Sequence, residues 1–220
     1  MTRPPFHAIF DVDGTMADTT ELHYAAFSQT AKEVGFHFDR ETFGRIFGMH
    51  NNQIFKLFCG ADLPQDRLDA MADRKEEIVR QAARQHLLPI KGLYGFLTEL
   101  EAARIPMAVG SSAPGKNLDV FLSAIDVLHR FDAIAHGDEV EHGKPDPGIF
   151  LLAAKKLKVP PAQCVVFEDA PAGVEAALRA GMKVVALTTN RTADFLASAQ
   201  CIVADFTELS VDRIGRLFHG

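Results

Sequence analysis

The sequence has few cysteines and no segment typical of export. Cys59, Cys164 and Cys201 are scattered along the 220 residues, and they form no Cys-x-x-Cys pair. A disulfide framework needs an even set, so we expect reduced thiols in a reducing compartment. The first residues, Met-Thr-Arg-Pro-Pro, are not followed by the long apolar region of a secretory signal. A cytoplasmic protein is therefore the expectation.

The chain also lacks a long apolar run and an excess of positive charge. No run approaches the roughly 18 apolar residues that a membrane helix needs. The net charge of −6 and the isoelectric point near 5.8 argue against nucleic acid or anionic membranes as partners. The 9 histidines show no metal-ligand spacing such as His-Glu-x-x-His. We expect a small-molecule partner and a monomer.

The most informative stretch that is present is Asp11-Val12-Asp13-Gly14-Thr15. It follows the apolar run of residues 8–10, which reads as a buried strand that ends abruptly. Ligands of open α/β sheets bind at the carboxyl ends of the strands. Two acids that repel each other at this place are expected to meet a cation or a phosphoryl group.

Three later segments offer matching chemistry. Gly110-Ser111-Ser112 ends one apolar run, Glu168-Asp169 ends another, and Gly143-Lys144-Pro145 places a lysine in a stiff turn. Like charges about 4 Å apart cost on the order of 4 kcal/mol at an effective dielectric near 20. If the strands are neighbours, a divalent cation and Lys144 would compensate the converging carboxylates.

Strand-like and helix-like segments alternate from Val109 onward. The expected strands are 133–135, 164–167, 184–187 and 202–203, and the expected helices are 120–128, one that follows Asp146-Pro147, and 171–180. This alternation predicts an α/β fold with a parallel sheet covered by helices on both faces.

Residues 19–86 differ from the rest. They lack a convincing strand pattern, and Leu68, Met71, Ile78 and Ala82 follow a helical stripe. We expect a helical insert, with hinges near residues 17–20 and 88–91.

The four motif segments, in this order, resemble the haloacid dehalogenase-like superfamily, and within it the β-phosphoglucomutase-like phosphatases and mutases. The resemblance extends from Phe6 to about Asp205. It implies a Rossmann-like core, residues 1–17 and 89–220, and an inserted α-helical cap, residues 18–88, which closes over the site.

The resemblance also implies catalytic roles. Asp11 would be the nucleophile that forms an aspartyl-phosphate, and Asp13 would protonate the leaving oxygen and later activate the acceptor. Mg²⁺ would bind Asp11, Asp169, the Asp13 backbone carbonyl and Glu168, the last directly or through water. The alternative for the first pair is ordinary turn chemistry at Asp13-Gly14.

Further residues are implied around the phosphoryl group. Lys144 and Ser111 would contact it, and Ser112 and Asn117 are candidates for substrate binding. Lys144 could instead be a solvated surface lysine, and Ser111 could cap the next helix. Glu168 or Asp169 could cap the helix that begins at Pro171.

Cap residues are weaker candidates for substrate binding. His23 follows Asp18 by five residues, as in β-phosphoglucomutase-like members, although a solvent-facing histidine is an equal alternative. Gly48 belongs to the cap loop. Arg74 and Lys75 could reach a substrate phosphate, but a charged outer helix face is the favoured reading.

The sequence departs from true β-phosphoglucomutases in this cap loop. These carry a Lys before the loop Gly and an Arg shortly after it, where this chain has Phe47 and residues 49–52, Met-His-Asn-Asn. The expectation is therefore a Mg²⁺-dependent phosphatase, a phosphoric monoester hydrolase, acting on a small metabolite such as a sugar phosphate. The alternatives are a β-phosphoglucomutase, a dehalogenase, against which Asp13 argues, and a non-catalytic binding protein.

Overall fold

The structure is a computed structural model that describes residues 6–46 and 51–219. Gly48, a candidate for substrate binding, lies outside these residues. The chain divides into two compact units. We call Met1–Asp18 with Leu88–Gly220 the core unit, and Thr19–Leu87 the inserted unit.

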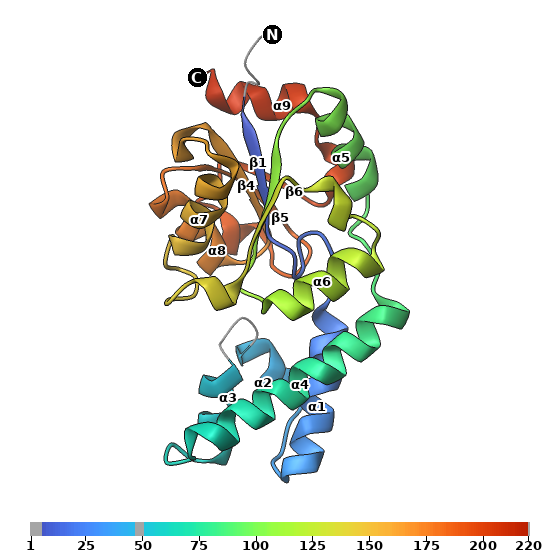
Figure 1. Cartoon of the computed structure of the whole chain (residues 1–220), viewed down its shortest axis with the longest axis vertical. Coiled ribbons are helices and arrows are strands. Elements are labelled where there is room, and N and C mark those ends of the chain that lie inside the picture. Colours follow the sequence, from blue (N-terminus) through green and yellow to red (C-terminus); the bar gives the residue numbers. More distant parts are fainter. Residues whose placement is uncertain (1–5, 47–50, 220) are drawn as a thin grey trace. The chain divides into compact units, whose positions relative to one another are not determined.

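The core unit contains a parallel sheet of 6 strands in the order β3-β2-β1-β4-β5-β6 (Figure 1). Most strand residues are buried, as expected of a parallel sheet covered on both faces. The sheet confirms the predicted α/β, Rossmann-like fold. The strands are β1 His7–Phe10, β2 Met107–Gly110, β3 Ala133–Ala135, β4 Cys164–Glu168, β5 Lys183–Leu187 and β6 Cys201–Val203.

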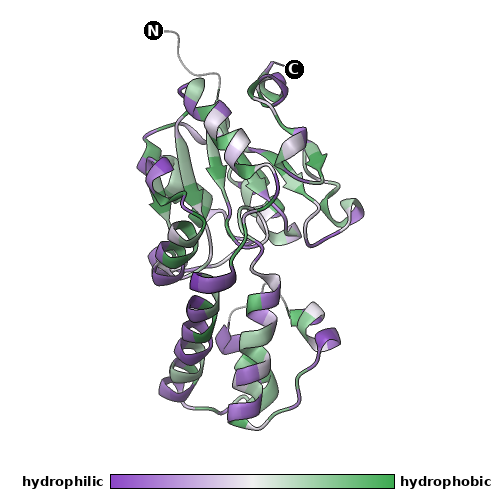
Figure 2. Cartoon of the chain, turned by 90° about the vertical axis from the view of Figure 1, so that its right-hand side faces the viewer, coloured by the Kyte–Doolittle hydropathy of each residue, from purple (hydrophilic) through white to green (hydrophobic). Residues whose placement is uncertain are grey.

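Helices cover both faces of this sheet, because successive strand residues point to opposite sides. Ile9 and Val166 pack in one apolar cluster with residues of α7 and α8. Phe10 and Phe167 face the other way, with their rings stacked at 4.5 Å and in edge contact with Phe96 of α5. Figure 2 shows strands of mainly hydrophobic residues and helices in which hydrophilic and hydrophobic residues alternate. The α-helices are α5 Leu93–Ala102, α6 Gly115–Ala124, α7 Gly148–Leu157, α8 Pro171–Arg179 and α9 Val211–Gly215.

One helix boundary was wrong. The apolar pattern predicted a helix over residues 120–128, but α6 begins at Gly115 and ends at Ala124. Asp126 has a left-handed φ of 52°, through which an α-helix cannot continue. The start was missed because glycine is a poor helix former and gives no start signal.

The inserted unit is helical, as predicted. Its helices are α1 Thr20–Val34, α2 Arg40–Ile46, α3 Asn51–Cys59 and α4 Gln65–His86. Aromatic rings from α1, α2 and α3 form its core with Leu68 of α4. The predicted stripe on α4 holds at Leu68 and Met71, which pack in this core, but shifts after Met71, where the fully buried positions are Lys75, Glu76, Val79 and Ala83.

The two chain segments that connect the units run side by side within the core unit. Ala17 and Pro89 form an antiparallel bridge. The amide of Asp18 donates to the Leu88 carbonyl at 3.0 Å, and the amide of Ile90 donates to the Met16 carbonyl at 2.8 Å. The chain therefore leaves and re-enters the core at one point.

Within residues 6–46 and 51–219, no helix combines the length and apolar character that crossing a membrane requires.

Candidate active site

The central strands bring the predicted acidic residues together. β1 pairs with β4 in a register that sets Phe10 opposite Phe167. The amide of Asp11 donates to the Phe167 carbonyl at 3.0 Å, so Asp11 and Glu168 leave the sheet side by side. The sheet continues from β1 to β2 and β3 on one side and from β4 to β5 and β6 on the other. This reversal of strand order is where open α/β sheets bind their ligands.

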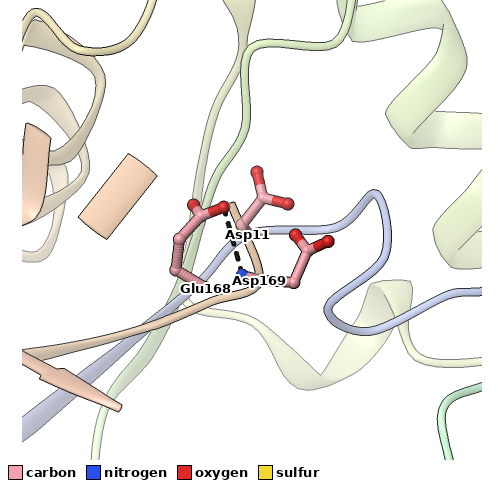
Figure 3. A group of neighbouring side chains, drawn as sticks. All are labelled: Asp11, Glu168 and Asp169. Carbon is pink, nitrogen blue, oxygen red and sulfur yellow. Dashed lines mark hydrogen bonds between the residues drawn. The ribbon is translucent and has the colours of Figure 1, made fainter. Parts of the chain in front are cut away.

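Three buried carboxylates form a cluster at this point. Asp11, Glu168 and Asp169 each offer an oxygen, and these atoms lie within 4.8 Å of one another (Figure 3). Mg²⁺ prefers oxygen ligands and keeps some of its waters, so this donor set suits it. The cluster therefore fits the metal that the sequence predicted.

Lys144 joins two of these carboxylates. Its Nζ lies 2.6 Å from Asp11 Oδ1 and 2.7 Å from Glu168 Oε2, and 4.8 Å from the centre of the Phe150 ring. The side chain is only 11% exposed, so the reading as a solvated surface lysine is wrong. Burial disfavours the charged amine, but Asp11 and Glu168 outweigh it and raise the pKa of Lys144 above its ordinary range.

Burial makes the charges of the acids costly. It raises the pKa of Asp11 well above the ordinary value, against the attraction of Lys144. Burial, together with the charge of Glu168, raises the pKa of Asp169 to about 7. A bound cation would favour both charged forms, which is the compensation that the clustered acids require.

Asp169 has two hydrogen-bond donors that the sequence did not indicate. Thr15 Oγ1 donates to its Oδ1 at 3.2 Å, and Asn190 Nδ2 donates to its Oδ2 at 2.8 Å. Thr15 belongs to the first motif, but Asn190 comes from the loop after β5. Its position just beyond a strand end was the one available signal, and an asparagine in a loop is ordinary turn chemistry.

Asp169 does not cap the next helix. The N-cap residue of α8 is Ala170, and no side chain bonds to it as a cap. Glu168 Oε1 accepts the amides of Asp169 at 3.2 Å and of Ala170 at 3.1 Å. The capping alternative for this pair is therefore wrong, and Glu168 instead holds the turn that orients Asp169.

Asp13 lies in a tight turn after β1. The amide of Gly14 donates to the Ala17 carbonyl at 2.8 Å, and Gly14 has a φ of 77°, which favours glycine. Asp13 is half-buried, and its charge contributes to the raised pKa of Asp11. The turn therefore keeps the second acid near the first.

Ser111 is buried at the end of β2, beside β1. Its Oγ accepts the amide of Ala113 at 3.1 Å, whereas the N-cap of α6 is Pro114. Ser111 therefore supports a turn and does not cap the helix. Ser112 is exposed, and Asn117 is buried in the first turn of α6.

Residues 8–187 match the model of a family described as haloacid dehalogenase-like hydrolase. The chain belongs to this family.

Members of the haloacid dehalogenase-like family with related sequences include sugar-phosphate enzymes. The chain is 36% identical to fructose-1-phosphate phosphatase YqaB of Escherichia coli, over 80% of this chain and 93% of the relative. It is 31% identical to validoxylamine A 7'-phosphate phosphatase of Streptomyces hygroscopicus, over 94% and 97%. The crystal structure of β-phosphoglucomutase from Clostridium difficile is similar with a TM-score of 0.86 and 25% identity, over 97% and 96%.

The predicted cap residues of the inserted unit have different surroundings. Arg74 is exposed and pairs with Glu33 at 2.7 Å, as an outer-face residue does. Lys75 is buried, so the outer-face reading is wrong for it. Its Nζ lies 2.8 Å from His23 Nδ1 and 2.7 Å from Glu76 Oε1. His23 is half-buried in this cluster, which contradicts the solvent-facing alternative.

Proposed function

We propose that the protein is a Mg²⁺-dependent phosphatase that hydrolyses a small phosphorylated metabolite, a sugar phosphate, through a phosphorylated Asp11. The observation that carries this proposal is the buried lysine that joins Asp11 and Glu168 within a cluster of three carboxylates. A lysine so placed holds the carboxylates close enough to receive a cation and an anionic phosphoryl group.

In this proposal an Asp11 carboxylate oxygen attacks phosphorus, and the bond from phosphorus to the ester oxygen breaks. Asp13, initially protonated, gives its proton to that oxygen, which leaves as an alcohol. Asp13 then takes a proton from water, whose oxygen attacks phosphorus and breaks its bond to Asp11. Inorganic phosphate forms and both aspartates return to their starting states.

The other site residues of the core unit stabilise the negative charge of the phosphoryl group during its transfer. Lys144 holds Asp11 and neutralises phosphoryl oxygens, and Ser111 donates a hydrogen bond to them. A Mg²⁺ held by Asp11, Asp169, Glu168 and the Asp13 carbonyl would supply positive charge against the same oxygens.

Substrate recognition would involve residues of both units. Ser112 and Asn117 in the core unit, and His23, Gly48, Arg74 and Lys75 in the inserted unit, are the candidates. A sugar phosphate is favoured because one of the two phosphatase relatives is named for fructose 1-phosphate, and both are named for small phosphorylated compounds. A cytoplasmic location and a monomeric state stay predictions.

A mutase is the second candidate, because a structure of similar fold is a β-phosphoglucomutase. A mutase must grip the distal phosphate of a bisphosphate, for which cations are needed. Phe47 and Asn51 stand where such enzymes have Lys and Arg, and the Asn51 side chain donates to Glu76 at 2.7 Å. This difference supports hydrolysis.

Asp11→Asn tests the proposal directly, because an amide keeps the shape of the side chain but cannot form the acyl phosphate. We expect the parent to release phosphate from a panel of sugar phosphates with Mg²⁺, and to lose this activity in a chelator. D11N should be inactive with a normal thermal midpoint. Asp18→Asn, at an exposed acid nearby, is the matched control. Equal activity of D11N and D18N would remove Asp11 from the nucleophile role.

A further inference from the structure

Asn190 contacts the acidic cluster from a loop that carries none of the family motifs. The loop follows β5, the strand paired with β4, and its Asn190 Nδ2 lies 2.8 Å from Asp169 Oδ2. Thr15 Oγ1 donates to the other oxygen, Oδ1, at 3.2 Å. The two oxygens of Asp169 are thus each held by a donor, and the donors come from two different loops.

The loop is fixed against the first motif. Thr189 Oγ1 donates to the Gly14 carbonyl at 2.5 Å. A Cβ atom at position 14 would collide with both Asn190 Nδ2 and Asp169 Oδ2. Glycine at this position therefore leaves the space that the hydrogen bond between Asn190 and Asp169 occupies.

An amide suits this contact better than a charged group does. Asp169 is buried beside Glu168 and Asp11, so an added carboxylate would repel it, while an ammonium or guanidinium would repel a cation that arrives there. A neutral N–H donor fixes one oxygen in direction and leaves lone pairs of the carboxylate for a cation. Such donors to metal ligands orient the ligand and tune its affinity.

We propose that Asn190 is a positioning residue of the metal site, which orients the Asp169 carboxylate for a divalent cation and does not itself touch the substrate. This inference rests on the magnesium site of the proposed function. Loss of the amide should weaken metal affinity about 10–100-fold, as is typical for partners of metal ligands. Turnover at saturating metal should change much less, because the reacting groups remain in place.

Calorimetric titration of the full chain with Mg²⁺ or Mn²⁺, without substrate, measures this affinity directly. Asn190→Ala removes the donor, and Asn190→Leu removes it while keeping the number and branching of the heavy atoms, so agreement between them separates the hydrogen bond from packing. Thr192→Ala is the control, since Thr192 is exposed in the same loop and has no hydrogen-bond partner for its hydroxyl among the described residues. The Mg²⁺ dependence of phosphate release and the thermal midpoint complete the set.

We expect about 10–100-fold weaker metal binding for N190A and N190L, parental binding for T192A, and a matching rise in the Mg²⁺ concentration for half-maximal activity. Unchanged metal affinity in N190A and N190L, or a fall in turnover that saturating metal does not restore, would overturn the role of Asn190. A parent that binds no metal would contradict the proposed magnesium site itself. A parent that binds metal in an Asn190-dependent way but releases no phosphate would contradict only the phosphatase reaction.

Discussion

Lys144 and Lys75 both place an ammonium group where little solvent reaches it. Lys144 is held by Asp11 and Glu168, and Lys75 by Glu76. A buried charge is costly unless it is paired and hydrogen-bonded, so each lysine needs a carboxylate partner; Lys144 has two, and Glu168 remains when Asp11 is replaced. In the core unit this pairing involves the proposed nucleophile, whereas in the inserted unit it determines stability.

Glu76 should make stability depend on pH. Burial alone would raise its pKa, but Lys75 and His23 outweigh burial, and the pKa falls from 4.5 to about 2. The unfolded chain then binds the proton more readily, so the stabilisation is complete above about pH 5 and is lost as the pH falls towards 2. Such a shift corresponds to about 3 kcal/mol at neutral pH. Glu76→Gln should lower the thermal midpoint at pH 7, and the gap to the parent should narrow towards pH 4.

Glu77→Gln is the matched control for this prediction, because Glu77 is exposed on the same helix and pairs with Arg80 at its surface. E77Q should follow the parent at both pH values. A constant gap between the parent and E76Q from pH 7 to pH 4 would contradict the pKa explanation.

At the scale of single residues, the sequence indicated the acids that stand at the ends of strands. It did not indicate the residues that hold the charged side chains in place. Asp11, Glu168 and Asp169 were recognised because acids directly after apolar runs are unusual. Asn190 stands in a loop rich in turn formers, where asparagine needs no further explanation. The burial of Lys75 was missed because a small error in helical register moves a residue from the outer face to the core.

At the scale of elements, a short 3-10 turn supports the segment that carries Ser111. This turn, η2, spans Gly137–Glu139 and follows β3. The amide of Gly137 donates to the Ala113 carbonyl at 2.9 Å, and the amide of Ser111 donates to the Ala135 carbonyl at 3.1 Å. The chain at the end of β3 therefore fixes the position of the turn that contains Ser111.

Gly137→Ala should disturb this support. A Cβ there would lie 2.9 Å from the Ser112 carbonyl carbon and closer still to its oxygen, so backbone must shift. We expect a loss of about 1–3 kcal/mol in unfolding free energy, as in overpacked cores, together with slower phosphate release. Chemical denaturation and an activity assay measure the two effects.

Gly95→Ala provides the contrast, because Gly95 is exposed in α5 and a Cβ there meets no atom within 4 Å. Alanine is the better helix former, so G95A should stabilise the protein by up to about 1 kcal/mol and leave activity unchanged. A G137A protein as stable and active as G95A would contradict the supporting role of η2.

Elements differ in how well the sequence predicts them. The strands of the core were predicted because a strand buried on both faces is a continuous apolar run between turn residues. The ends of α6 were not, because the extended Pro114 before the helix and the left-handed Asp126 after it set them through backbone conformation and not through hydropathy. The helix α5, before β2, was not predicted, because only the segments after Val109 show a clear alternation.

At the scale of the whole molecule, the fate of phosphorylated Asp11 distinguishes a hydrolase from a mutase. Water should win the competition for phosphorylated Asp11, because no cation stands at positions 47 and 51 to hold a second phosphate. With β-glucose 1-phosphate and a trace of the bisphosphate, we expect free phosphate to form faster than glucose 6-phosphate. A coupled assay for both products measures the ratio, and D11N should abolish both. Faster formation of glucose 6-phosphate would favour the mutase.

The pairing of the segments at Ala17 and Pro89 affects which changes in the inserted unit the core unit can tolerate. Because the chain departs from the core and returns at adjacent residues, the ends of the inserted unit are already closed by the bonds of Asp18 and Ile90. Insertions at such closed points are tolerated, since they alter no strand register. The core can therefore accept a shorter, longer or unrelated insert and keep its carboxylates in place, so the inserted unit can diverge without disturbing the acidic cluster.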